Sequence, residues 1–179
     1  MKLILATMMV FINYSGVSAQ ISRKVSTYLL TQYNNTLYDR TAGNNPWGIG
    51  LGIQGFYNNG TRFKPTLELT GDVYLEDDKV LRLNADGAVP LATNDIGGMV
   101  NLFAGVSYHP NLRSYFSFTA GPSFISGKTL LGIKPSLGWY FSNSQKWTGK
   151  ISYINIFNRD SFSREDFGSI SVGVGLKLF

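Results

Sequence analysis

The stretch Ser169-Ile-Ser-Val-Gly-Val-Gly-Leu-Lys-Leu-Phe179 at the C-terminus decides the fold. Its apolar residues occupy every second position and alternate with serine, glycine and lysine. Successive side chains of a β-strand point to opposite faces, so these apolar residues share one face. A chain that ends within a strand needs a partner for that strand, and pairing with its own first strand removes the free edge. We therefore expect an antiparallel barrel closed by its first and last strands.

Seven further alternating segments of similar length precede this one. Read back from the C-terminus, the series is 167–179, 146–157, 129–141, 114–125, 97–108, 63–75, 47–57 and a vaguer segment at 24–34. Eight is an even number, as an up-and-down barrel with both termini on one side requires. The predicted fold is an all-β, eight-stranded antiparallel up-and-down transmembrane barrel. Ten strands are the alternative, if part of the longest connection enters the wall.

Residues 1–19 are predicted to be a signal peptide, and residues 20–179 the outer-membrane barrel domain. Met1-Lys2 gives a short basic start, residues 3–12 an apolar core, and Val17-Ser18-Ala19 a small-residue cleavage site. The apolar run is too short to cross a bilayer as a helix. A buried N-terminal strand or helix is the alternative. We expect cleavage at Ala19, export, and integration into the outer membrane of the cell.

The composition is unusual for a soluble domain. Charged residues make up 15% of the chain, where roughly 25% is typical, while aromatic residues make up 14% and there are 20 glycines. No window approaches the length of apolar sequence that a transmembrane helix needs. The basic residues are scattered without a patch, so we expect no nucleic-acid partner. The chain has no cysteine, which excludes a disulfide framework and lipid anchoring through cysteine.

The residue types on the two strand faces separate a membrane barrel from a soluble one. In 47–57, 114–124 and 129–141, one face is bulky and apolar and the other is mainly Gly, Ser and Thr. A soluble barrel would show charged residues to water, whereas a narrow eight-stranded barrel has room inside only for small side chains. We therefore expect residues such as Phe118 and Leu131 to face lipid. A secreted ligand-binding barrel, with the apolar face inside, is the alternative.

Five charged residues are predicted to form an ion-pair network in the lumen. Lys64, Glu68 and Asp72 share one face of their segment, and Lys134 and Lys150 fall on the inward face of theirs. Buried charges need partners, so the two carboxylates are natural counter-ions for the three lysines. Such a network either plugs the core or lines an ion-selective path. In a barrel of eight strands we favour the plug.

Aromatic residues gather near the ends of the segments, which is typical of the girdles at the two membrane interfaces. The residues predicted to form the girdles are Tyr57, Phe63, Tyr108, Tyr115, Trp139, Phe141 and Trp147 beside the short turns, and Trp47, Tyr74, Phe157 and Phe167 beside the loops.

The connections alternate between short turns and longer loops, as in outer-membrane barrels whose turns face the periplasm. The turns are at 58–61, 109–112 and 142–145, and the other connections are 35–46, 76–96, 126–128 and 158–166. Loop 76–96 is the longest, and its residues 79–92 could form a hairpin that recruits a surface partner by strand addition. Its acidic cluster could bind divalent cations or bridge lipopolysaccharide, or could simply be a solvated loop.

Nothing in the sequence supports catalysis. Hydrolysis or acyl transfer needs a nucleophile and a base held together by a third group. The one histidine, His109, lies in a periplasmic turn before Pro110, where a structural role is expected. No His or Cys cluster has metal-ligand spacing, and Gly48-x-Gly50-x-Gly52 indicates strand packing rather than a phosphate-binding loop. We expect no catalytic residue, metal or cofactor.

Two stretches carry a family resemblance. Ala120-Gly-Pro-Ser-Phe124 and Lys134-Pro-Ser-Leu-Gly-Trp-Tyr-Phe141 resemble the outer membrane protein beta-barrel domain family common in Bacteroidetes, and residues 24–179 resemble small outer-membrane barrels of Gram-negative bacteria. The resemblance implies that the barrel-assembly machinery reads Phe179, and that outer-membrane lipid and lipopolysaccharide surround the barrel. The apolar residues at 170–178 run out of phase with Phe179, which departs from the usual assembly signal.

The expected function is a non-enzymatic structural or cell-surface interaction role that acts through the extracellular loops. A porin-like path for small solutes and a secreted ligand-binding barrel are the alternatives. Channel conductance separates the first two, and membrane fractionation separates both from the third.

Overall fold

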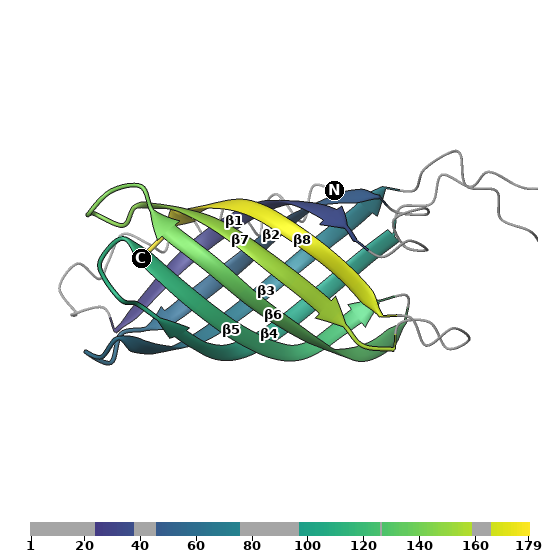
Figure 1. Ribbon diagram of the computed structural model, residues 1–179, viewed down its shortest axis with the longest axis horizontal. Helices are drawn as coiled ribbons and strands as arrows, with labels where there is room; N and C mark the ends of the chain where they lie inside the picture. Colours follow the sequence, from purple (N-terminus) through teal and green to yellow (C-terminus); the bar gives the residue numbers. More distant parts are fainter. Residues whose placement is uncertain (1–23, 38–45, 76–96, 126, 159–165) are drawn as a thin grey trace, which may run out of the picture.

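The computed structural model describes residues 24–37, 46–75, 97–125, 127–158 and 166–179. Eight antiparallel strands close into a barrel in chain order (Figure 1). They are β1 (Val25–Thr36), β2 (Trp47–Tyr57), β3 (Phe63–Leu75), β4 (Gly97–Tyr108), β5 (Ser114–Ile125), β6 (Lys128–Tyr140), β7 (Trp147–Ile156) and β8 (Phe167–Lys177). No helix in these ranges is long and apolar enough to cross a membrane. The predicted signal peptide and the whole of loop 76–96, with its predicted hairpin at 79–92, lie outside them.

The first and last strands pair, as the C-terminal stretch predicts. Leu29 of β1 lies opposite Ile53 of β2 on one side and opposite Leu176 of β8 on the other. The pairing continues past β8, because the Leu178 amide donates to the Thr27 carbonyl at 2.8 Å. This ladder removes the free edges that an open sheet would expose. The predicted eight-stranded barrel is confirmed.

The alternative of ten strands is wrong. β3 pairs with β4 along its whole length, from Phe63 opposite Tyr108 to Tyr74 opposite Gly97. Because these two strands are direct neighbours, the connection between them cannot add strands to the wall.

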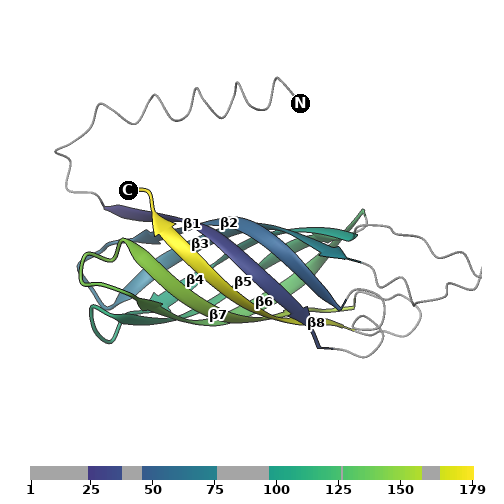
Figure 2. The same ribbon diagram turned by 90° about the horizontal axis from the view of Figure 1, so that it is seen from above.

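The two ends of the barrel differ in their connections. The start of β1 and the end of β8 lie at the same end as the three short turns, which we call the turn end; the opposite end is the loop end (Figure 2). Two of the turns are held by asparagine side chains. The Asn59 carbonyl oxygen accepts from the Thr61 amide at 3.1 Å, and the Asn111 carbonyl oxygen accepts from the Arg113 and Ser114 amides at 2.8 and 2.9 Å. Asparagine favours such turns by this bonding.

The strand faces are oriented as the alternation predicts. Phe118 is 58% exposed and Leu131 is 59% exposed on the outer surface, while their polar and small neighbours are buried inside. The solvent-accessible face of the wall is thus apolar, and most of the buried side chains are polar. This is the reverse of a soluble barrel.

Inward glycines make room for large inward side chains on adjacent strands. A Cβ at Gly138 would overlap the ring of Tyr115, its register partner on β5. A Cβ at Gly50 would overlap a carboxylate oxygen of Asp72, its partner on β3. Without these glycines the narrow interior could not hold rings and carboxylates at the same level.

Candidate functional site

A buried carboxylate with two lysines lies at the centre of the lumen. Glu68 projects from β3 and is 1% exposed; Lys134 from β6 and Lys150 from β7 are 1% and 3% exposed. Lys134 Nζ donates to Glu68 Oε1 at 2.7 Å, and Lys150 Nζ donates to Glu68 Oε2. Each carboxylate oxygen therefore holds one ammonium group. These bonds link three strands across the interior rather than along the wall.

Asp72 lies four residues after Glu68 on the same face of β3. Its carboxylate accepts hydrogen bonds from amide side chains instead of lysines. Its Oδ1 accepts from Gln32 Nε2 at 2.6 Å and from Asn34 Nδ2 at 2.7 Å, and its Oδ2 accepts from Asn101 Nδ2 at 3.1 Å. Gly50 lies between Gln32 and Asp72 in the register of β1, β2 and β3, and its missing side chain leaves space for this contact. An ionised carboxylate in a low-dielectric site needs several such donors.

Gln32 joins the two carboxylate sites into one network. Lys134 Nζ donates to Gln32 Oε1 at 3.4 Å, while the amide of the same side chain donates to Asp72. Two lysines and two carboxylates therefore meet in one buried network whose formal charge is zero. Charge balance is what makes burial of four ionised groups tolerable.

Of the five residues predicted for the lumen network, the structure joins Glu68, Lys134 and Lys150 as ion pairs. Asp72 is joined to them through Gln32. Lys64 lies apart, half-buried at the turn end. Sequence reasoning missed the amide donors of β1 and β4, because amide side chains show their role only when the strand register is known.

An apolar cluster closes the lumen towards the loop end. Tyr74, Phe103, Ile154, Ile156 and Phe167 are buried together there, with Met99 and Ile125. The rings of Tyr74 and Phe167 meet edge to face at 5.2 Å between centroids, a favourable aromatic geometry.

A second cluster, built from aromatic rings, closes the turn end. Tyr115 lies 5.2 Å from Phe56 and 5.4 Å from Tyr140, measured between ring centroids, and Tyr28 packs on the same group. His109 stacks on Tyr115 at 5.4 Å. The network of charges is therefore covered at both ends.

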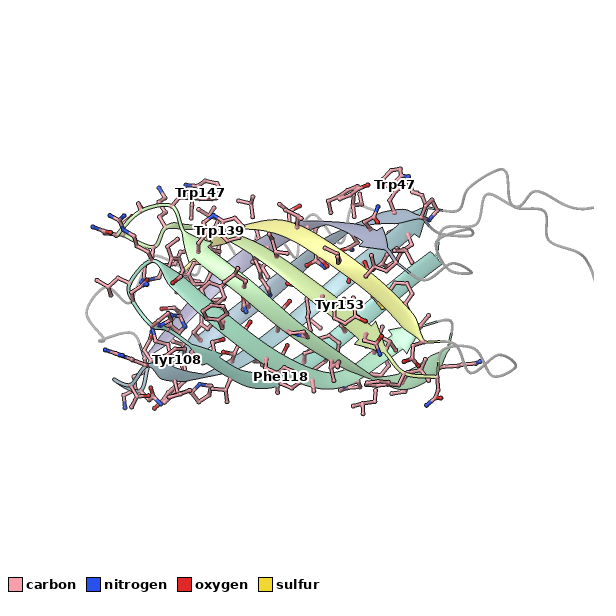
Figure 3. The ribbon with its side chains drawn as sticks, viewed as in Figure 1. Trp47, Tyr108, Phe118, Trp139, Trp147 and Tyr153 are labelled. Atoms are coloured by element: carbon pink, nitrogen blue, oxygen red, sulfur yellow. The ribbon has the colours of Figure 1, made fainter. Side chains whose placement is uncertain are left out.

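These two clusters correct the girdle prediction for three residues. Tyr74, Tyr115 and Phe167 are buried inside the barrel and do not reach an interface. A position near a strand end does not decide which face of the strand an aromatic side chain occupies. The face is decided by the residue's place in the alternation of inward and outward side chains along the strand. Tyr57, Phe63 and Phe141 are exposed at the turn end, as predicted. Trp147 is exposed at the same end and Trp47 at the loop end (Figure 3).

His109 is held neutral by its surroundings. Burial, and then the nearby positive charge of Lys64, lower the pKa of His109 to about 4. Its ring packs against Phe56, Tyr115 and Tyr140. This is a packing role at the turn-end cluster, and no carboxylate or hydroxyl bond of the kind that orients a catalytic base is seen there among the described residues. No three His, Cys, Asp or Glu side chains in the described ranges gather as a metal site.

Two shallow grooves mark the outer surface, each about 630 Å³. Both are lined almost entirely by apolar side chains, such as Phe116 and Ile151 in one and Leu67 and Leu102 in the other. Phe179 lies exposed at the turn end, where its carbonyl oxygen accepts from the Thr27 amide at 3.3 Å.

No protein-family model matches the chain, and no curated protein matches it. Solved structures of Ail, the attachment invasion locus protein of Yersinia pestis, do. Ail in a phospholipid bilayer nanodisc gives a TM-score of 0.55 at 11% identity, over 86% of this chain and 99% of that one. The Ail crystal structure gives 0.54 at 12% identity, over 86% and 97%. Ail in complex with the heparin analogue sucrose octasulfate gives 0.51 at 13% identity, over 86% and 97%. The likeness is one of fold. The Bacteroidetes-type family stays a prediction.

Proposed function

We propose that this protein is an integral outer-membrane β-barrel with a closed lumen, non-enzymatic, and active through the connections at its loop end. One observation carries the proposal: charged side chains are inside and hydrocarbon side chains are outside. Glu68 and its two lysines are buried, while Phe118 and Leu131 are more than half exposed. Only a surrounding of lipid makes both the burial of these charges and the exposure of these apolar side chains favourable.

The outer apolar surface supports a membrane location over a secreted barrel. Soluble monomers rarely expose a contiguous apolar patch of more than roughly a few hundred Å², yet here the outward residues of all eight strands are mainly apolar. Cell fractionation tests the location. We expect the protein in the outer-membrane fraction, with a gel mobility that changes on heating. Recovery from the soluble fraction would overturn the proposal in favour of a secreted ligand-binding barrel.

The sealed interior favours a structural or interaction role over a pore. A conducting path would have to pass the aromatic cluster at the turn end, which contains Tyr115, and the apolar cluster towards the loop end, which contains Phe103. It would also have to pass the ion pairs between the two clusters. Single-channel recording in a planar bilayer tests this. We expect no current above the bilayer background; a steady, reproducible conductance would contradict the closed lumen and favour the small-solute pore.

The loop end offers the surface for a partner. By sequence, the connections there and the first residue of β6 carry nine acidic residues against six basic ones: Asp39, Glu76, Asp77, Asp78, Asp86, Asp95, Asp160, Glu165 and Asp166 against Arg40, Lys79, Arg82, Lys128, Arg159 and Arg164. Ail binds the heparin analogue sucrose octasulfate. The acidic balance here favours a neutral or cationic partner over a polyanion.

Deletion of residues 79–92 tests the loop role. Intact cells that display the wild-type barrel should bind a cationic or neutral surface better than cells with the deletion, at equal amounts of folded barrel on the cell. Equal binding by both would rule out that segment as the contact. Protease treatment of intact cells gives a second readout, since cleavage within 76–96 is expected only if the loop end faces outward.

Export and assembly complete the proposal. N-terminal sequencing of the outer-membrane form should begin at Gln20 if cleavage follows Ala19. The substitution Phe179→Ala keeps the main-chain bond to Thr27. It should lower the amount of assembled barrel in the cell with little change in stability once folded, because the proposed reader of the aromatic side chain is the assembly machinery.

A further inference from the structure

A regular set of cations surrounds the turn end. Each of the four strands that leave this end is immediately preceded by a basic residue. Lys24 precedes β1, Arg62 precedes β3, Arg113 precedes β5 and Lys146 precedes β7, and all four are exposed. Because these strands alternate around the barrel, the four charges are spread over the whole rim. We call these four residues the cationic ring.

The cationic ring has no acidic side chain to neutralise it in the part of the chain that the structure describes. The described carboxylate side chains are Glu68 and Asp72 in the lumen and Asp166 at the loop end. Arg113 Nε donates to the neutral amide oxygen of Asn143 at 3.2 Å. The terminal carboxylate of Phe179 is the one acidic group of the described residues at this rim. The ring therefore has a net positive charge.

The ring lies directly beyond the apolar surface of the barrel. Phe63 and Trp147 follow two of its residues in sequence, and both side chains are exposed on the outer wall. In Figure 3, Trp139 and Trp147 mark this end, and Trp47 marks the other. Amphipathic rings settle at the level of lipid headgroups. The cations next to them are thus placed at the depth of the lipid phosphates.

We propose that the cationic ring binds anionic glycerophospholipids in the leaflet at the turn end and selects them over zwitterionic ones. The inference rests on the proposed membrane location and adds the class of lipid and the leaflet. Charge complementarity and continuity with the hydrocarbon-facing wall identify the occupant. A soluble acidic protein would bind the four charges but would not account for the exposed aromatic side chains beside them.

Tryptophan quenching by brominated lipids tests the proposal, because the three tryptophans lie at opposite ends. A Trp47→Phe variant leaves Trp139 and Trp147 as reporters of the turn end. The double variant Trp139→Phe/Trp147→Phe leaves Trp47 as reporter of the loop end. Each is reconstituted into vesicles of phosphatidylcholine containing phosphatidylglycerol, with the bromine on one lipid or the other. Both leaflets have the same composition, so orientation does not affect the result.

We expect brominated phosphatidylglycerol to quench the turn-end reporters with a relative affinity about threefold above that of brominated phosphatidylcholine, and the excess to fall with added salt. The loop-end reporter should show no such excess. Neutralising the ring with Lys24→Gln, Arg62→Gln, Arg113→Gln and Lys146→Gln should remove the preference. The matched loop-end variant Lys128→Gln should keep it.

Equal quenching by the two lipids at the turn end, or an equal preference at both ends, would overturn the proposal. Either would leave the membrane location standing, since the tryptophans would still be quenched. A barrel that is quenched by neither lipid would overturn the proposed function together with this inference. If soluble phosphate competes as well as phosphatidylglycerol vesicles, the ring binds free anions and the lipid assignment is wrong.

Discussion

Replacement of Glu68 by glutamine is the most direct test of how this interior is stabilised. Glu68→Gln keeps the volume of the side chain but removes the charge shared by Lys134 and Lys150, which are 1% and 3% exposed. Asp72 is then the one carboxylate for two buried ammonium groups. Removing one partner of a buried ion pair costs about 3–5 kcal/mol. We expect a loss of this size in the free energy of unfolding.

The assay is urea unfolding of the vesicle-reconstituted barrel, followed by tryptophan emission and by gel mobility. Two variants serve as controls. Lys146→Gln removes an exposed cation and should change stability by less than about 0.5 kcal/mol. The double variant Glu68→Gln/Lys150→Met removes one charge of each sign, so that Lys134 and Asp72, joined through Gln32, still balance, and it should be more stable than Glu68→Gln. A loss below about 1 kcal/mol for Glu68→Gln, the value of an exposed pair, would refute the reasoning.

Three further predictions concern packing, pH and the outer surface. Gly138→Val should lower the free energy of unfolding by about 1–3 kcal/mol, because the new side chain overlaps Tyr115. The same substitution in a Tyr115→Ala background should lower it much less, as urea unfolding of both pairs of proteins will show. The pKa of His109 is lowered to about 4 in the folded barrel, so its contribution to stability is intact above the unfolded pKa of about 6.5 and is lost as the pH falls from there towards 4. Unfolding at about pH 7 and pH 4.5 should show this loss, and His109→Phe should reduce it. Phe118→Lys should cost about 2–4 kcal/mol in lipid, whereas Leu112→Lys in an exposed turn should be neutral by the same assay; equal costs would contradict the membrane-facing assignment.

The strand positions and faces could be predicted because each depends on local pattern alone. The predicted segments 47–57 and 63–75 coincide with β2 and β3, and the C-terminal segment 167–179 contains β8. A period of two fixes the face of every residue once one residue is placed. Turn residues then fix where each strand ends. These features need no knowledge of which strand lies beside which residue.

The contents of the lumen could be predicted only in part, because they depend on register. Glu68, Lys134 and Lys150 stand out in sequence as inward charges, whose need for partners is general. Gln32 carries no such signal, and its bond to Asp72 exists because Gly50 lies between them in three paired strands. The place of Tyr115 near a turn predicts an interface position for its side chain. Its burial depends on Gly138 opposite it, and that pairing is invisible in either segment alone.

The charges of this molecule fall into three groups, and only one of them is needed by the fold. The lumen holds a neutral set that links the strands across the interior. The turn end has a basic residue before each outgoing strand, and the loop-end connections hold every acidic residue of the sequence except Glu68 and Asp72. A closed antiparallel wall forms equally well with polar residues of any charge at its rims. Rims of opposite charge are therefore not required by the wall, and under the proposed function the partners of this barrel are to be sought at its two ends.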